Sequence, residues 1–222
     1  VGRELEAGTA SLAWTMSRSR RRWYLNRALL LAVTLAVILT LPAFAANVLE
    51  HARQPHVDPW SSFNDSGIRG PVLVLFGLLT YAIAVVAGAM LGRQLPAVIV
   101  TIVLVLTVLA GFESGLDRWE RSLAEWLPAS STTYSIDLVF DEQYRDRASG
   151  EITDQNAVMA AAPQIDGGPN GAWIDARYES VALVVPGGRY GFVVAIQAAA
   201  LGSAAVLLVG LGLLVVNRRR PD

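Results

Sequence analysis

Carboxylates and histidines are the side chains of this sequence that could do chemistry. His51, His56 and Asp58 lie close together, but they stand in a Pro-containing loop with no helical or strand period to direct them at one metal ion. A larger group of carboxylates follows, and its spacings match neither a calcium loop nor a glycosidase-type acid pair. Its members include Asp137, Asp141, Glu142, Asp146, Glu151, Asp154, Asp166 and Asp175. We predict solvated side chains in both places rather than a metal or catalytic centre.

The residue types that are missing exclude several kinds of site. All 18 basic residues are arginine, and the sequence contains neither lysine nor cysteine. A P-loop needs lysine on the nucleotide phosphates, so the chain has no nucleotide site of that type. Without cysteine it has no disulfide, thiolate metal site or cysteine nucleophile. Because no nucleophile and base pair up in the remaining sequence either, we do not expect an enzyme.

The opening residues, 1–27, form a polar segment that leads into an apolar run. Glu4 and Glu6 stand near the start of a predicted helix, where the helix dipole favours carboxylates. Leu5, Leu12 and Met16 fall on one stripe of that helix. A basic and aromatic collar follows, made of Arg18, Arg20, Arg21, Arg22, Trp23 and Tyr24. We predict a short amphipathic helix with one face free for a partner; a positive-inside anchor is the alternative and would explain the arginines alone.

Four long apolar runs are the elements that must position these groups. With 53% hydrophobic residues and a mean hydropathy of +0.42, the chain is too apolar for a soluble domain of its size. Four uncharged runs reach the roughly 20 residues that a membrane span needs: 28–46, 71–91, 95–112 and 191–216. A secretory signal peptide is the rival interpretation of the first run, but three more runs follow it. We predict an all-α polytopic membrane protein with four transmembrane helices.

Arginine is distributed unevenly between the two sides of these spans. One side, residues 1–27, 92–94 and 217–222, carries 10 arginines against 3 carboxylates. The other side, residues 47–70 and 113–190, carries 8 arginines against 16 carboxylates. Because cytoplasmic segments are enriched in basic residues, we predict a plasma-membrane protein with both ends of this chain in the cytoplasm.

The predicted organisation has four parts. A cytoplasmic helix and collar (1–27) precede three transmembrane helices (28–112), which include an outer loop at 47–70. An extracytoplasmic cap (113–190) and a last transmembrane helix with a basic tail (191–222) complete the chain. In the outer loop, Pro59, Trp60 and Phe63 are typical of a segment that rests on the membrane interface.

Residues 113–190 show the periodicities of a small α+β cap. Apolar residues first recur at helical spacing up to Pro128, then alternate as in a half-buried strand. A second helical stretch ends before Pro163. The expected elements are a helix over 116–127, a strand over 134–140, a helix over 153–162 capped by Thr153 or Asp154, and one or two strands in 173–185.

Small and hydroxyl residues punctuate the predicted spans. Gly88 and Gly92 form a G-x-x-x-G pair, which lets helices approach closely in lipid. This pair could serve packing within the chain or a homodimer contact. The hydroxyl residues in the spans, among them Thr34, Thr40, Tyr81, Thr101, Thr107 and Ser203, are expected to donate to backbone carbonyls.

Several short motifs carry a resemblance to a known family. The string E-L-E-A-G-T-x-x-L-A-W-T-x-S-x-x-R-x-R-W, residues 4–23, resembles the cytoplasmic loop of ATP-binding-cassette permeases of the type-2 membrane-domain family, in particular the actinobacterial drug-export branch. Arg189, Tyr190, Phe192 and Gln197 are similar to the entry of the final span in that branch, although Ala200 stands near the place of its usual acid.

The resemblance implies a function in transport. In that family the Glu-x-Gly-Thr segment is a coupling helix that docks on an ATPase subunit, which here implies a coupling role for Glu4, Glu6, Gly8, Thr9, Leu12 and Arg18. The chain would be the permease subunit of an exporter for an apolar or amphipathic substrate. A separate cassette ATPase would bind ATP and Mg²⁺, the lipid bilayer and a second permease copy would be further partners, and nucleic acid would not be one.

The resemblance also concerns the number of spans. Membrane domains of that family have six spans, so the resemblance implies two more before Val1, which is itself not an initiator residue.

The sequence leaves two other classes of function to weigh. A secondary transporter is disfavoured because the ionisable intramembrane residues that such carriers use are missing here. The alternative function is a membrane-anchored sensor or interaction protein that binds a ligand or partner through the cap.

Overall fold

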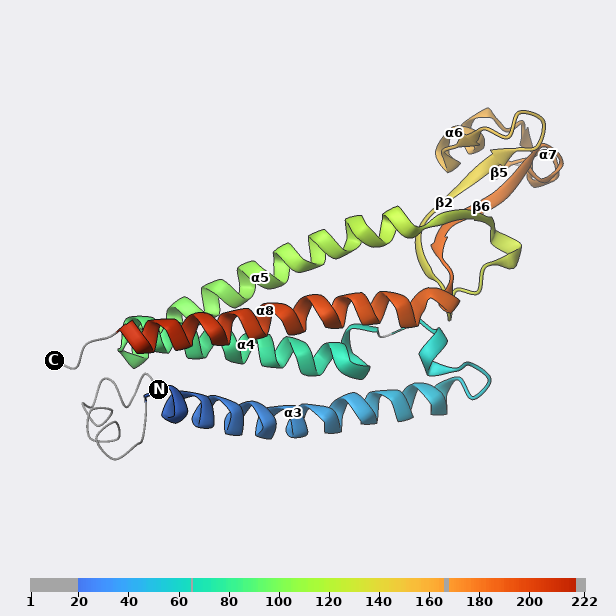
Figure 1. Cartoon of the computed structure of the whole chain (residues 1–222). Coiled ribbons are helices and arrows are strands. Elements are labelled where there is room, and N and C mark those ends of the chain that lie inside the picture. The colour runs from blue at the N-terminus through green and yellow to red at the C-terminus, as the bar shows by residue number, and fades with distance from the viewer. Residues whose placement is uncertain (1–19, 65, 166–167, 219–222) are drawn as a thin grey trace. The chain divides into compact units, whose positions relative to one another are not determined.

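The computed structural model describes residues 20–64, 66–165 and 168–218. The chain divides into two units (Figure 1). The first unit, here called the helical unit, comprises residues 1–56, 65–114 and 192–222. The second, here called the sheet unit, comprises residues 57–64 and 115–191.

Four helices among the described residues are long and apolar enough to cross a membrane. They are α3 (Arg20–Arg53), α4 (Gly70–Leu91), α5 (Gln94–Leu123) and α8 (Tyr190–Arg218). They contain the four predicted runs and confirm a polytopic membrane protein. At about 1.5 Å per residue, the 34 residues of α3 give a helix of about 50 Å, longer than the roughly 30 Å hydrocarbon core. α3 therefore extends beyond its apolar run.

Glycine and proline set the two ends of α4. Pro71 lies in the first turn, where its missing N–H is not needed. At the other end Gly92 adopts a φ of 64°, in the left-handed region, and its N–H donates to the carbonyl of Gly88 at 3.1 Å. α5 begins at Gln94, so the connection between the two helices is short.

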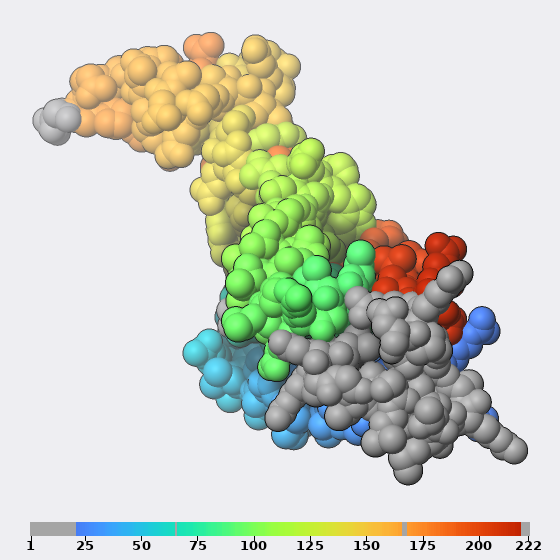
Figure 2. Space-filling model, turned by 90° about the vertical axis from the view of Figure 1, so that its left-hand side faces the viewer, coloured from blue at the N-terminus to red at the C-terminus, as the bar shows by residue number. Residues whose placement is uncertain are grey.

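α4 is the most buried of these helices. In its most apolar window 44% of the residues are buried, against 6% in the corresponding window of α5. Figure 2 shows the atoms of α5, in green, on the surface of the helical unit. The exposed side chains of α3 and α5 are largely aliphatic, as a surface in contact with lipid tails requires.

A buried cluster joins α3, α4 and α8. Its members are Trp23, Tyr24, Ala28, Val85, Ala89 and Val216. The hydroxyl of Tyr24, which is fully buried, donates to the carbonyl of Val209 in α8 at 3.4 Å. Gly212 allows this approach, because a Cβ there would fall on the Tyr24 hydroxyl. Tyr81 adds a second link, since its hydroxyl donates to the carbonyl of Ala28 at 3.1 Å.

The hydroxyl groups within the spans bond to the helix backbone, as predicted. Thr34 and Thr40 in α3 donate to the carbonyls four residues earlier at 2.9 and 2.7 Å. Thr101 and Thr107 in α5 do the same at 2.7 and 2.8 Å. These groups are therefore satisfied within their own helices and form no polar site.

The sheet unit is built on a four-stranded antiparallel sheet with the order β1-β6-β2-β3. The strands are β1 (Glu125–Pro128), β2 (Leu138–Asp146), β3 (Ile152–Thr153) and β6 (Tyr178–Val185). The helices α6 (Gln155–Ala161) and α7 (Gly171–Arg177) share a small core of Val158, Ala162 and Ile174. A separate pair, β4 (Gln164–Ile165) and β5 (Gly168–Pro169), lies between these helices in the chain. The small α+β unit predicted from periodicity is present.

The helix predicted over 116–127 is wrong at its C-terminal end. α5 stops at Leu123, and Trp126 and Leu127 lie in β1, opposite Leu183 and Ala182 of β6. The apolar spacing of these residues fits a helix, but pairing with a distant strand satisfies the same backbone groups and partly buries the side chains. Tertiary pairing therefore overrides the local pattern.

Two other predicted strands need correction. The strand expected at Tyr134 begins at Leu138, because the Asp137 carboxylate accepts the Thr133 N–H (2.8 Å) and stabilises a turn over the intervening residues. The start of the predicted strand 173–185 is the helix α7, whose N-cap Asn170 accepts the Trp173 N–H at 3.3 Å. The helix over 153–162 is confirmed as α6.

Candidate functional site

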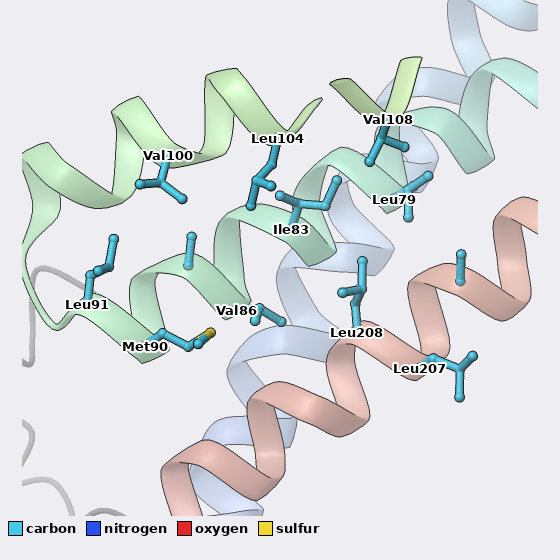
Figure 3. A pocket seen from close by; sticks show the side chains of 12 residues that line it. Leu79, Ile83, Val86, Met90, Leu91, Val100, Leu104, Val108, Leu207 and Leu208 are labelled. Carbon is cyan, nitrogen blue, oxygen red and sulfur yellow. The ribbon is translucent and has the colours of Figure 1, made fainter. Parts of the chain in front are cut away.

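The helical unit contains an apolar pocket between α4, α5 and α8 (Figure 3). Its volume is about 560 Å³, which is within the usual range of ligand pockets. The side chains that line it are aliphatic apart from one thioether: Leu79, Ile83, Val86, Ala87, Met90, Leu91, Val100, Leu104, Val108, Ala204, Leu207 and Leu208.

Helical periodicity places these side chains on facing stripes. In α4 the stripe recurs every three or four residues from Leu79 through Ile83 to Met90. In α5 it consists of residues four apart, Val100, Leu104 and Val108, and in α8 a single turn contributes. The short connection after Gly92 brings the stripes of α4 and α5 side by side, as Figure 3 shows.

The pocket combines a closed floor with an exposed rim. Ile83 and Ala87 are buried, whereas Met90 exposes 56% and Leu207 exposes 73% of their surfaces. Because α4, α5 and α8 have the length and composition of membrane spans, the pocket lies at the depth of the hydrocarbon core when the chain is in a bilayer. A ligand could therefore enter from the lipid phase.

The lining restricts what the pocket can bind. Among the residues that the structure describes, the lining includes no hydroxyl, amide or charged side chain, and the helical backbone groups are already hydrogen-bonded. A polar group placed inside would lose its hydrogen bonds to water without replacement, which costs about 2–7 kcal/mol. The pocket thus suits hydrocarbon or the apolar part of an amphipathic molecule.

The histidines of the first outer loop do not assemble into a site. His51 lies in the last turn of α3, and His56 follows that helix. Across the residues that the structure describes, no three His, Cys, Asp or Glu side chains come together in a way that could hold a metal ion.

Several carboxylates of the sheet unit stabilise turns. Asp137 accepts the N–H groups of Thr133 and Gly187, each at 2.8 Å, and so joins two segments that are distant in sequence. Asp154 is the N-cap of α6 and accepts the Asn156 N–H at 2.8 Å. Asp137 was predicted only as part of a solvated acidic surface, so the structure corrects its role. Asp154 was one of the two predicted caps of this helix, and the structure confirms it.

Asp146 has a similar role at the end of β2. Its carboxylate accepts the N–H of Ala148 (2.8 Å) and of Ser149 (3.2 Å), and it pairs with Arg177 at 3.3 Å. These backbone donors, followed by the guanidinium, lower the pKa of Asp146 below its usual value. The negative charge of Asp146 therefore stabilises the turn between β2 and β3.

The predicted coupling residues lie outside the described part of the chain. They are Glu4, Glu6, Gly8, Thr9, Leu12 and Arg18, and their role stays a prediction. The predicted packing residues Gly88 and Gly92 lie in and just after the last turn of α4, Gly88 being buried. Gly92 terminates the helix, a role that the spacing did not indicate, and the packing role of both glycines stays a prediction.

The sequence analysis missed a tightly packed junction in the sheet unit. Gly187 sits so close to its neighbours that a Cβ would fall on the Ile136 side chain and the Ser61 carbonyl. The N–H of Phe63 donates to the Ile136 carbonyl at 2.9 Å. Residues 57–64 of the outer loop between α3 and α4 are therefore part of the sheet unit, and the P-G-G sequence ending at Gly188 was the one local signal of a close approach.

Comparison with known proteins gives one match. A family model described as ABC-2 membrane transporter related matches residues 1–115, slightly more than half of the 222 residues. The matched range contains α3, α4 and most of α5, whereas the strands and α8 lie outside it. No curated protein and no solved structure matches the chain.

Proposed function

Because the chain belongs to the ABC-2 membrane transporter related family, we propose that it is the permease subunit of an ATP-driven exporter for apolar or amphipathic substrates. The family and the four apolar helices support the coarser assignment, a membrane subunit of an ABC transporter. Export out of the cell, a drug-like or antibiotic substrate and the actinobacterial drug-export branch are the finer parts of the proposal. Family membership favours transport over the sensor alternative.

The apolar pocket is the observation that carries the proposed substrate class. Its buried floor at Ile83 and Ala87 and its exposed rim at Met90 and Leu207 suit a molecule that partitions first into the bilayer. Burial of apolar surface is worth roughly 25 cal/mol per Å², so hydrocarbon entering from water would bind favourably. A substrate that enters from lipid gains less binding free energy, because lipid tails are as apolar as the pocket. This weaker binding suits a substrate that must also be released.

A substitution in the pocket tests this role. Leu104 lines the pocket, and Leu106 on the same helix exposes 61% of its surface outside it. Leu104→Trp should lower the ATP-dependent efflux of an amphipathic bis-benzimide dye several-fold, because the indole occupies the pocket. The matched control Leu106→Trp should leave efflux unchanged. Equal effects of the two variants, measured in vesicles with the ATPase present, would count against the pocket as a substrate site.

Coupling to ATP is proposed to occur through the opening residues. A chain without lysine has no P-loop, so ATP and Mg²⁺ would be held by a separate cassette ATPase. Glu6→Arg should uncouple transport from ATP hydrolysis, since it replaces an attraction to a basic partner groove with repulsion. Leu5→Met is a conservative control in the same segment. Unchanged transport and unchanged substrate-stimulated ATPase activity in Glu6→Arg would leave only the anchor interpretation of these residues.

The proposal includes a pair of permease subunits, most simply two copies of this chain. It also places both ends of the chain in the cytoplasm and the sheet unit outside. Gly88→Leu should weaken assembly, because a large side chain prevents close helix approach in lipid. Since Gly88 is buried within one chain, thermal unfolding of the variant would separate a loss of internal packing from a loss of assembly. If oligomer size in detergent and in lipid did not change, Gly88 would have a role only within the chain.

A further inference from the structure

Trp60 is a large aromatic side chain held in an exposed position by ordered backbone. It lies in the short helix η1 (Pro59–Ser61) and exposes 60% of its surface. The carboxylate of Asp58 accepts the backbone N–H of Trp60 at 3.0 Å, and the Asp58 carbonyl accepts the backbone N–H of Ser61 at 2.9 Å. The backbone of this turn is thus fixed by its own hydrogen bonds.

The residues that follow Trp60 are locked into the sheet unit. Ser62 is fully buried, and its hydroxyl donates to the Ser135 carbonyl at 2.9 Å. Phe63 is buried too, with its N–H on the Ile136 carbonyl (2.9 Å). The sequence-based expectation that Phe63 rests on the membrane is therefore wrong, and Trp60 alone of this pair of aromatics points outward.

Contacts within the sheet unit place this turn close to the first residue of α8. The rings of Phe63 and Tyr190 pack edge to face with centroids 5.3 Å apart. Tyr190 is the first residue of α8, and the uncharged apolar run of that helix starts at Gly191. Trp60 is three residues from Phe63, so its Cα lies within about 11 Å of the Cα of Phe63.

The chemistry of the indole ring selects the environment that matches this position. Tryptophan combines a large apolar body with one N–H donor, and it concentrates where the bilayer hydrocarbon meets the headgroups. An exposed indole in water would gain nothing from being held rigidly. We propose that the turn from Asp58 to Ser61 is a membrane anchor, with Trp60 inserted at the headgroup–acyl boundary of the leaflet in which α8 begins.

This contact would have a function distinct from substrate transport. It would fix the loop between α3 and α4, and the sheet unit of which that loop is part, to the lipid surface. The turn carries one carboxylate, Asp58, which is occupied in capping, so the ligand class is a zwitterionic phospholipid surface rather than an anionic headgroup. The proposal does not depend on the identity of the substrate.

The absence of cysteine from the sequence allows a sharp test of this position. Trp60→Cys and, as a matched control, Ala148→Cys in the exposed turn after β2 would each carry one nitroxide label in the full chain in phosphatidylcholine vesicles. The measured quantity is the ratio of the label's accessibility to oxygen, which dissolves in lipid, to its accessibility to a water-soluble nickel chelate. This ratio should be several-fold higher for the label at position 60 than for the label at position 148. Equal nickel accessibility would show a water-exposed turn and overturn the proposal. Shielding from both reagents would show a protein contact and overturn it too.

A second measurement examines the native indole. Vesicles of phosphatidylcholine brominated near the carbonyl end of the acyl chains should quench more of the emission of the wild-type chain than of Trp60→Phe. The control Trp173→Phe removes a partly buried indole of α7 that packs against the ring of Tyr178. In this control, the fraction of the emission that bromine quenches should be unchanged or larger. If Trp60→Phe quenched to the same extent as the wild type, the indole would not reach lipid.

Discussion

Replacing Gly212 with alanine should weaken the contact between α3 and α8 in a way that depends on Tyr24. The new Cβ would fall on the Tyr24 hydroxyl and lie 3.1 Å from Cζ and 3.4 Å from a methyl carbon of Val86. Tyr24 is fully buried, so its ring has no free space into which it could move. Overpacking of this kind costs about 1–3 kcal/mol.

Removing the hydroxyl should relieve most of that clash. Tyr24→Phe alone loses the bond to the Val209 carbonyl, which at 3.4 Å is long and worth about 0.6 kcal/mol by the average for such bonds in membranes. In the double variant the nearest ring atom is Cζ, which needs to shift by only a few tenths of an ångström. We expect the double variant to be more stable than the sum of the single changes predicts, by about 1 kcal/mol or more.

Thermal unfolding of the wild type, Gly212→Ala, Tyr24→Phe and the double variant in one detergent measures this coupling. Gly210→Ala on the same helix is the control, because no atom lies within 4 Å of the Cβ position there and the added methyl has room. The control should be neutral or slightly stabilising. If the effects of Gly212→Ala and Tyr24→Phe added within about 0.5 kcal/mol, the two side chains would not meet and the packing argument would be refuted.

Three further predictions concern the sheet unit. Gly187→Ala should destabilise the sheet unit by about 2 kcal/mol or more, because the new Cβ would fall on the Ser61 carbonyl, which cannot rotate away. The control Gly188→Ala should leave stability unchanged, because no atom lies within 4 Å of the Cβ position there. The susceptibility of the two variants to protease measures the difference. The folded-state pKa of Asp146 is lowered, so the stability that its charge gives the folded sheet unit is present above the unfolded-state pKa and is lost as pH falls through the folded-state pKa. Asp146→Asn should make the stability less dependent on acid pH, measured as unfolding followed by circular dichroism. Asp154→Ala should cost about 1 kcal/mol and speed hydrogen exchange in α6.

Elements with local signals were predictable from the sequence. The four spans could be predicted from the length of the uncharged apolar runs alone. In a bilayer, such a run must satisfy its own backbone hydrogen bonds, and an α-helix does so. α6 was predicted with its cap, since Asp154 and Pro163 lie at its ends and act through adjacent backbone. These features depend on interactions over a few residues and need no knowledge of the fold.

Features that depend on distant residues were not predictable. Trp126 and Leu127 satisfy a helical period, and only their partners in β6 make them a strand. Similarly, the stripe through Leu104 could not be recognised as a pocket wall, because every face of α5 within the membrane is apolar. The packing of neighbouring helices, rather than the pattern along one helix, decides which stripe faces a cavity.

The participation of residues 57–64 in the sheet unit has a consequence for synthesis of the protein. Phe63 cannot reach its ring partner Tyr190 until 126 intervening residues have been made. At 5–20 residues per second, this delay is about 6 to 25 s. During that interval α3 and α4 exist without the segments that later cover Ser62 and Phe63. The loop between them is therefore an early-made part of a late-folding structure, and chaperones or proteases at the membrane surface would encounter it exposed.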